Sequence, residues 1–245
     1  MNLDNYLDIA KSAALLAGEF LLKSQGEKLD ILFNKGRDLK LKIDIDAERI
    51  IKEQLKLKST YPILGEETGI TEELEDFYWV VDPLDGTSNF LREIPICCVS
   101  IALMHKTKAI LGVIYDFNHD DLYYGYQGSK AYVNNQEIRV SSLSQKNMST
   151  LVTGIPAKTH YTDIEFQKMI SNFQSWKKIR MIGSAAMAAV YVASGKAETY
   201  QEDGIFLWDV AAGAAIVKAA GGSISLKNLK TDFRVDAIFS NNNIN

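Results

Sequence analysis

Cysteine is scarce in this chain of 245 residues, which contains only Cys97 and Cys98. Adjacent cysteines can be bridged only through a strained ring, so the sequence offers no disulfide framework of the kind that small secreted domains use. Both cysteines lie in the apolar stretch 96–99, which predicts a buried strand with two free thiols. We therefore expect a reduced, cytoplasmic protein.

Long hydrophobic runs and an excess of positive charge are also absent. No stretch of about 18 apolar residues occurs, so no membrane-spanning helix is predicted. Residues 1–11 are polar and amphipathic, unlike the basic and then apolar start of a secretory signal. Lys and Arg total 27 against 31 Asp and Glu, a formal net charge of −4. This balance, without a basic stripe, argues against nucleic-acid and membrane partners.

The remaining composition is that of a folded globular protein, with 47% hydrophobic and 24% charged residues. No repeat or linker divides the chain, but its pattern changes after residue 142. Before that point short strands dominate, and after it strands alternate with helices, which is typical of α/β structure. We predict two packed lobes, residues 1–142 and 143–245.

Apolar spacing predicts the elements of both lobes. Leu3 to Leu21 carries apolar residues spaced 4, 3, 4, 3 and 4, which form one face of an amphipathic helix. Alternating apolar residues predict strands at 29–33 and 39–45, joined by a turn at 34–37 and followed by a helix at 47–57. Further strands are predicted at 63–64, 78–81, 99–104, 109–115, 122–125 and 131–133, the last four as an antiparallel meander. In the second lobe we predict strands at 150–153, 178–181 and 197–200 and helices at 164–173, 185–193 and 208–220.

Carboxylates stand where the apolar strand at 79–81 ends. Asp82 follows that strand, and Asp85 comes three residues later, beyond Pro83, so a tight turn could direct both acids at one point. Gly86 lets the backbone approach a ligand closely, and residues 87–89 begin a helix whose free N–H groups suit phosphate. The alternative explanation for this segment alone is a capped turn with Asx hydrogen bonds.

Two other segments carry acids in similar positions. Glu66 and Glu67 follow the strand at 63–64, and Asp209 opens the helix at 208–220. Taken separately, they could be a solvated loop and a helix cap. Together they occupy the positions where α/β proteins place functional groups. Oxygen ligands without Cys or His favour Mg²⁺ over zinc or copper.

These segments resemble a known family. Asp82–Pro83–Leu84–Asp85–Gly86–Thr87, preceded by Gly65–Glu66–Glu67 and followed by Trp208–Asp209–Val210–Ala211–Ala212–Gly213, is similar to the signature of inositol monophosphatases over nearly the whole chain. The wider group of lithium-sensitive, Mg²⁺-dependent phosphatases includes fructose-1,6-bisphosphatases and bisphosphate nucleotidases. The resemblance implies a fold of α+β and α/β character, a layered α-β-α-β-α sandwich, and a homodimer.

The resemblance also implies a set of metal ligands. Glu66, Asp82 and the backbone carbonyl of Leu84 would hold a first Mg²⁺, and Asp82, Asp85 and Asp209 a second. Glu66 would also be a ligand of a third, more weakly bound Mg²⁺. Such ions can neutralise a phosphoryl group and activate a water molecule without a covalent intermediate.

The remaining roles concern catalysis and substrate. By the same resemblance, Thr87 and Glu66 would orient and deprotonate the attacking water, with support from Asp44. Glu67 would orient the residues around the metals. The substrate-binding residues would be Gly86, Thr87 and Ser88 for phosphate, and Ser184, Ala185 and Glu202 for the leaving group.

One departure from the family stands three residues before Asp44, where Lys40–Leu41 replaces a Val-Thr pair and removes a hydroxyl. We expect a phosphomonoesterase for inositol monophosphate or a related polyol or sugar phosphate, since a carboxylate at Glu202 suits a polyol. The alternatives are a 3′(2′),5′-bisphosphate nucleotidase, a fructose-1,6-bisphosphatase and a non-catalytic binding protein on the same fold. Retention of all the acids argues against the last.

Overall fold

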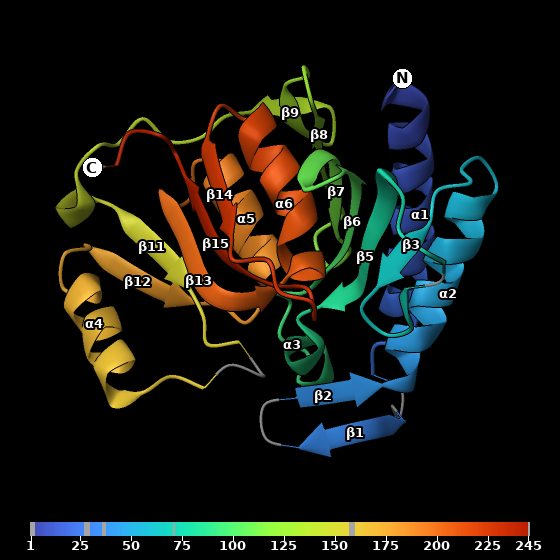
Figure 1. Ribbon diagram of the computed structural model, residues 1–245, viewed down its shortest axis with the longest axis horizontal. Coiled ribbons are helices and arrows are strands. Elements are labelled where there is room, and N and C mark those ends of the chain that lie inside the picture. Colours follow the sequence, from blue (N-terminus) through green and yellow to red (C-terminus); the bar gives the residue numbers. More distant parts are fainter. Residues whose placement is uncertain (1–2, 27–29, 36–37, 71, 157–159, 245) are drawn as a thin grey trace.

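Helices and sheets alternate in layers in the computed structural model, which describes residues 3–26, 30–35, 38–70, 72–156 and 160–244. On one outer side, α1 (Leu3–Lys23) and α2 (Lys42–Lys56) cover an eight-stranded sheet. Helices α5 (Ala185–Ala193) and α6 (Leu207–Ala219) lie between this sheet and a five-stranded sheet, and α4 (Asp163–Phe173) lies beyond the second sheet (Figure 1). The predicted α-β-α-β-α sandwich is confirmed.

The eight-stranded sheet has the order β10-β9-β8-β7-β6-β5-β3-β4. Strands β3 and β5 run parallel, and the other neighbours among the described strands are antiparallel, so the predicted meander is confirmed. Strand β5 is covered on both faces, which explains its continuous apolar sequence. The strands are β3 (Ile63–Gly65), β4 (Gly69–Ile70), β5 (Phe77–Asp85), β6 (Cys98–His105), β7 (Lys108–Asp116), β8 (Asp121–Tyr126), β9 (Ala131–Val133) and β10 (Gln136–Ile138).

The five-stranded sheet has the order β12-β11-β13-β15-β14. Strand β11 is parallel to both β12 and β13, whereas β15 is antiparallel to its neighbours. A short 3-10 helix, Lys146–Met148, precedes β11. Helices α5 and α6 pack against both sheets, and the division into lobes at residue 142 stays a prediction. The strands are β11 (Thr150–Thr153), β12 (Lys178–Met181), β13 (Thr199–Phe206), β14 (Ser223–Lys227) and β15 (Arg234–Ser240).

The hairpin and helix after residue 30 differ from the prediction. Strands β1 (Ile31–Lys35) and β2 (Asp38–Leu41) form a hairpin, but α2 begins at Lys42, so the predicted strand at 39–45 is wrong beyond residue 41. The backbone N–H of Leu41 donates to Asp44 Oδ2 at 3.0 Å, which satisfies a free donor at the helix start. Residues 29, 36 and 37, part of the predicted strand and turn, lie outside the described residues.

Small residues set the position of α6 between the sheets. A Cβ atom on Gly112 of β7 would lie 2.2 Å from the carbonyl oxygen of Ala212, and one on Gly213 would lie 2.3 Å from Ala189 Cβ of α5. The helix therefore packs directly against β7 on one side and α5 on another. Among the described residues, no helix has the length and hydrophobicity needed to cross a bilayer.

Candidate active site

Three acids from separate elements meet where β3, β5 and α6 come together. Glu66 follows β3, Asp82 lies in β5, and Asp209 lies in the first turn of α6. One carboxylate oxygen from each lies within 4.8 Å of those of the other two. The backbone N–H of Glu66 donates to the carbonyl of Val81 at 3.1 Å, which fixes Glu66 beside β5. The convergence expected from strand ends and a helix start is therefore present.

The electrostatics of this cluster fit a divalent cation. Burial, reinforced by neighbouring carboxylates, raises the pKa of Glu66 to about 8 and those of Asp82 and Asp209 well above their usual range. Asp82 Oδ1 accepts the N–H of Leu84 at 3.0 Å, but no described residue donates a hydrogen bond to Asp82 Oδ2. A buried, unpartnered oxygen within a set of carboxylate oxygens is a suitable ligand for Mg²⁺.

Asp85 lies in the same region, but its side chain is hydrogen-bonded to the start of α5. Its Oδ2 accepts hydrogen bonds from Ser184 Oγ at 2.6 Å and from the N–H of Ala186 at 2.7 Å. Burial raises the pKa of Asp85 to about 6, although these bonds favour the charged form. Ser184 also accepts the N–H of Met187 at 3.1 Å and so caps α5. We expected Ser184 to contact substrate, whereas its hydroxyl is engaged with Asp85.

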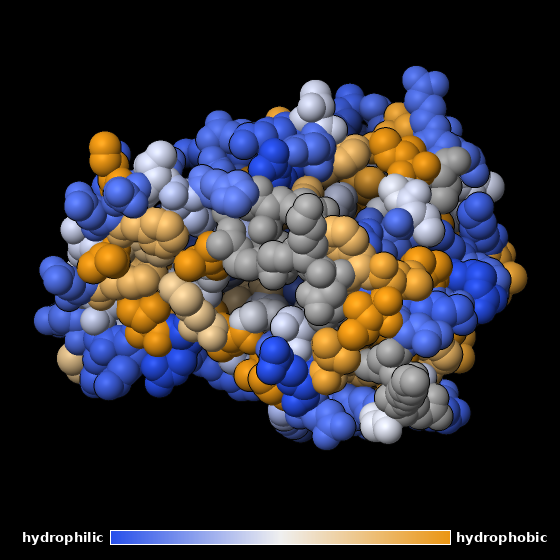
Figure 2. All heavy atoms as spheres, turned by 90° about the horizontal axis from the view of Figure 1, so that it is seen from below, coloured by the Kyte–Doolittle hydropathy of each residue, from blue (hydrophilic) through white to orange (hydrophobic). Residues whose placement is uncertain are grey.

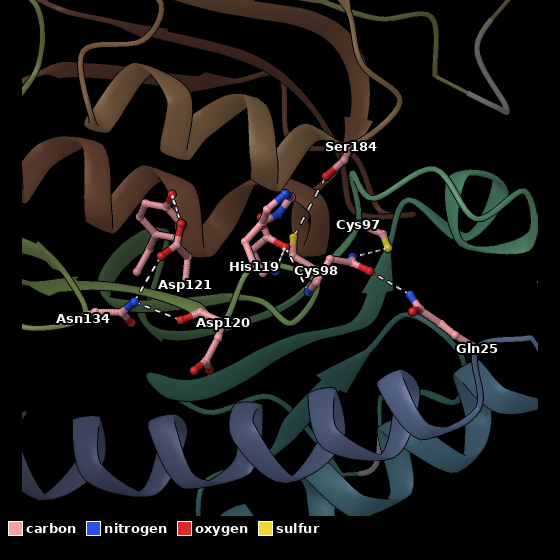
Figure 3. Close-up of polar contacts among 11 residues, drawn as sticks. Gln25, Cys97, Cys98, His119, Asp120, Asp121, Asn134 and Ser184 are labelled. Carbon is pink, nitrogen blue, oxygen red and sulfur yellow. Dashed lines mark hydrogen bonds and ion pairs between the residues drawn. The ribbon is translucent and has the colours of Figure 1, made fainter.

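Both cysteines lie close to these residues and are fully buried. Cys98 Sγ is 4.0 Å from Ser184 Oγ, and Figure 3 shows the two side chains pointing toward each other. Cys97 Sγ accepts from Asn118 Nδ2 at 3.3 Å, and Gln25 Nε2 donates to the same amide at 2.7 Å. Both thiols are buried and free, as predicted, but only Cys98 lies in a strand, β6, and Cys97 directly precedes it.

The turn after β5 leads into the short helix α3 (Thr87–Leu91). Gly86 has a φ of +95°, and a Cβ atom there would lie 2.8 Å from the carbonyl oxygen of Ile96, so both conformation and space require glycine. Thr87 Oγ1 donates to the carbonyl of Leu84 at 3.1 Å. Asn89 Nδ2 donates to the carbonyls of Ile96 and Ile182, which ties this turn to the segment before α5.

A cavity of about 330 Å³ collects most of the predicted site residues. Asp82 and Leu84 do not line it; they are about 1% exposed and lie in β5. Asp44 does not line it either: it is buried in α2, where burial raises its pKa to about 7. The predicted residues that line the cavity are Glu66, Asp85, Gly86, Thr87, Ser88, Ser184, Ala185, Glu202 and Asp209.

Glu202 stands at the boundary with a second, larger cavity of about 690 Å³. Its Oε2 accepts from Tyr200 Oη at 2.8 Å, and burial raises its pKa to about 7. A Cβ atom on Gly154 would lie 1.7 Å from Glu202 Oε1, so the carboxylate lies directly against the backbone of residue 154. Thr153, Gly154 and Glu202 line both cavities. The space beside Glu202 therefore continues toward α4.

The departure at residues 40 and 41 introduces a cation next to the acids. Lys40 Nζ lies 3.0 Å from Glu67 Oε2, and the Glu67 side chain is only 4% exposed. Leu41, at the position of the missing hydroxyl, is fully buried in the apolar layer beneath α1 and α2. Sequence reasoning also missed Glu48, a fully buried acid one helical turn after Asp44 whose spacing places both on one face of α2.

Comparisons with known proteins agree with this geometry. The sequence model of the inositol monophosphatase family matches residues 2–238. The Nus factor SuhB of Xylella fastidiosa is 37% identical over 222 residues, which cover 89% of this chain and 80% of that protein. An inositol-1-monophosphatase of Synechocystis sp. is 36% identical over 229 residues, covering 91% and 79%. The solved structure of an inositol monophosphatase from Anabaena (Nostoc) sp. matches with a TM-score of 0.85 and 33% identity, covering 98% and 92%.

These matches extend over nearly the whole chain. They include the eight-stranded sheet and α6, which together contribute the acids of the cluster. They indicate a phosphatase, a hydrolase that acts on phosphate monoesters, and the family is in general Mg²⁺-dependent. The resemblance carried by the Asp82–Thr87 segment and its two companion segments is thereby confirmed. The chain belongs to the inositol monophosphatase family.

Proposed function

We propose that this protein is a Mg²⁺-dependent phosphomonoesterase that hydrolyses inositol monophosphate or a related polyol or sugar phosphate. The observation that carries the proposal is the carboxylate cluster: Glu66 and Asp209 line a cavity that also reaches Glu202, and Asp82, with its unpartnered buried oxygen, lies beside them. The cluster supplies ligands for the metal, and Glu202 supplies an acceptor for hydroxyl groups of the substrate.

The metal would be held by the acids of the cluster and by two neighbouring groups. Glu66, Asp82 and Asp209 would hold Mg²⁺, with Asp85 and the Leu84 carbonyl as further ligands. Bound Mg²⁺ would neutralise the phosphoryl oxygens, lower the pKa of the attacking water and stabilise the leaving alkoxide.

The chain's own groups would then position the reactants. The backbone N–H groups at 86–88 would hold the phosphate at the start of α3. Thr87, whose hydroxyl donates to the Leu84 carbonyl, would accept a hydrogen bond from the water and so orient it, and Glu66 would accept the proton that the water releases. Burial raises the pKa of the Cys97 thiol to about 12, so this nearby thiol is not a nucleophile at neutral pH.

The leaving group would extend away from the metal ligands toward Glu202. Tyr200 already donates one hydrogen bond to this carboxylate, and Gly154 leaves room for it at the cavity wall. Its remaining lone pairs can accept hydrogen bonds from hydroxyl groups. A polyol offers several neighbouring hydroxyl donors to these lone pairs, which supports the polyol over the nucleotide.

Three alternatives remain, and two observations support them. The 690 Å³ cavity beyond Glu202, bordered by Tyr161, Lys168 and Lys230, has room for a larger leaving group, as a bisphosphate nucleotide or a fructose bisphosphate would require. A partner-binding role is suggested by the relative named Nus factor SuhB. The acids would then serve structure or regulation, and hydrolysis would be absent.

The test is phosphate release with Mg²⁺ from inositol 1-phosphate, fructose 1,6-bisphosphate, adenosine 3′,5′-bisphosphate and an aryl phosphate. We expect the highest kcat/KM for inositol 1-phosphate. A preference for the nucleotide moves the assignment to the nucleotidase. No release from any of the four, by folded protein with Mg²⁺ bound, contradicts the enzymatic proposal and favours the partner-binding role.

A pair of variants then tests the leaving-group contact. Glu202→Gln should lower kcat/KM for inositol 1-phosphate by about tenfold or more, since a buried acceptor is replaced in part by a donor. It should affect the aryl phosphate much less. The matched control is Asp203→Asn, which changes the exposed neighbouring acid. Equal losses for both substrates would argue against contact between Glu202 and the leaving group.

We also propose a homodimer. The face of the molecule in Figure 2 shows apolar areas over α4 and over the hairpin of β1 and β2. Exposed apolar side chains there include Ile164 and Ile170 of α4 and Leu32 of β1, which are 65%, 56% and 54% exposed. Apolar side chains gathered on one face favour self-association. Light scattering at several protein concentrations tests this, and a monomer throughout would contradict it.

A further inference from the structure

We propose that Glu48 is a positioning residue that holds the loop carrying Glu66 in register with β5. Glu48 lies in α2, is completely buried, and does not line the cavity of the proposed active site. Glu48 therefore does not face the proposed metal site itself, and its hydrogen bonds act on the loop. The inference rests on the proposed function only in taking Glu66 as a metal ligand.

The carboxylate of Glu48 collects donors from the loop directly after Glu66. Its Oε2 accepts the backbone N–H of Glu67 at 2.8 Å. Its Oε1 accepts the backbone N–H of Thr68 at 3.2 Å and also the Thr68 hydroxyl. Lys52, one helical turn further along α2, places Nζ 2.8 Å from Oε1. A buried carboxylate with four donors is close to fully satisfied, so its position and that of the loop are fixed together.

Gly65 shows the same contact from the other side of Glu66. A Cβ atom built on Gly65 would lie 2.5 Å from Glu48 Cδ, and 2.5 and 2.6 Å from its two oxygens. The backbone at residue 65 therefore rests against the carboxylate, and only glycine leaves space for it. Because φ at Gly65 is not in the left-handed region, this requirement comes from Glu48 alone.

These contacts constrain the backbone on both sides of Glu66. Residue 65 packs on the Glu48 carboxylate, and residues 67 and 68 donate to it, while the N–H of Glu66 itself donates to Val81 of β5. Since Val81 directly precedes Asp82, the distance between the carboxylates of Glu66 and Asp82 depends on this arrangement. The negative charge of Glu48 is balanced by Lys52, whose side chain is only 12% exposed.

Glutamine is the informative replacement because it keeps the length of the side chain. One oxygen would become an NH₂ group facing N–H donors, so at least one loop donor loses its acceptor and Lys52 loses its counter-charge. Partners that orient metal ligands typically change metal affinity by about 10- to 100-fold when they are mutated. The matched control is Glu53→Gln, an exposed acid on the same helix that pairs with Arg49.

The experiment measures Mg²⁺ binding without substrate, by calorimetric titration and by the rise in unfolding temperature that Mg²⁺ produces. For Glu48→Gln we expect the Kd for Mg²⁺ to rise about tenfold or more, with a correspondingly smaller thermal shift, while Glu53→Gln behaves like the wild type. A folded Glu48→Gln protein with wild-type Mg²⁺ affinity would overturn the inference.

If Glu48→Gln does not fold, Thr68→Val gives the answer instead, because it removes one donor and keeps the backbone N–H. We expect a several-fold weaker Mg²⁺ affinity, and unchanged affinity would overturn the inference. Failure of the proposed function is distinguishable: a wild-type protein that binds Mg²⁺ but hydrolyses none of the four esters disproves the enzyme, and the effect of Glu48 on binding is still measured.

Discussion

Replacing Gly112 by alanine should force α6 away from the eight-stranded sheet. The added Cβ atom would lie 2.2 Å from the carbonyl oxygen of Ala212, and 2.8 and 2.9 Å from the carbonyl carbon and Cα of that residue. Ordinary contact begins near 3.4 Å, so the helix or the strand must move by about 1 Å. The obstacle is backbone on both sides, which cannot rotate away as a flexible side chain would.

Overpacking of this kind costs typically 1–3 kcal/mol, and a clash between two backbones belongs at the upper end, about 3 kcal/mol. For a chain of this size, each 1 kcal/mol lowers Tm by about 2–4 °C, so we expect Gly112→Ala to lower Tm by about 6–12 °C. Because Asp209 lies in the first turn of α6, the same displacement should weaken Mg²⁺ binding.

The assay is calorimetric unfolding with and without Mg²⁺. Gly128→Ala is the control: Gly128 has a φ of +90° but no neighbour within 4 Å of a new Cβ atom, so only backbone strain, about 1 kcal/mol, applies. If Gly112→Ala is no less stable than this control, the close packing of α6 on β7 has been misjudged. If stability falls but Mg²⁺ binds as before, Asp209 does not depend on the position of α6.

Three further predictions concern charge and thiols. Asp85→Asn should abolish Mg²⁺-dependent turnover while circular dichroism shows a folded protein, because a charge is removed at nearly constant volume; turnover close to wild type would contradict the metal assignment. With a chelator present, Tm should fall as pH rises from about 4.5 to about 8, because folded Glu66 retains a proton that the unfolded chain has released; a flat profile in calorimetry would refute this. Cys97 and Cys98 should react with a thiol reagent only as fast as the protein unfolds, and rapid labelling of the native protein would show that they are accessible.

The acid cluster could be predicted because its signals are local. Pro83 and Gly86 mark a tight turn, the apolar run before Asp82 marks a buried strand, and Asp209 stands at a helix start. Each acid is therefore attached to a recognisable element end, and ends of neighbouring elements meet at one edge of a sheet. The layered order of helices and sheets followed from the same motifs by resemblance.

The start of α2 was missed because its sequence satisfies two patterns. Leu41, Ile43 and Ile45 alternate as in a strand, but Ile43, Ala47 and Ile51 are also spaced four apart, and these three are buried on one helix face. The hydrogen bond between Asp44 and the Leu41 N–H favours the helix. Strands β14 and β15 were not predicted for another reason: parts of both are exposed, which weakens the alternation of apolar and polar residues.

Contacts that depend on tertiary proximity had no signal in the sequence. Lys40 meets Glu67 across 27 residues, and Glu48 meets the N–H of Glu67 across 19. Ser184 was assigned to the substrate, yet its hydroxyl donates to Asp85 across 99 residues. A motif identifies which residues belong to a site, but their division between ligands and supports depends on the packing of the two sheets.

The acids of the site come from positions far apart along the chain, and this affects how it is made. During synthesis, Glu66, Asp82 and Asp85 leave the ribosome well before α5 and α6 have been translated. Asp85 then lacks its hydrogen bonds from Ser184 and Ala186, and the cluster lacks Asp209. High-affinity Mg²⁺ binding should therefore appear only once α5 and α6 have docked. The metal would then stabilise only chains that have been fully synthesised and folded.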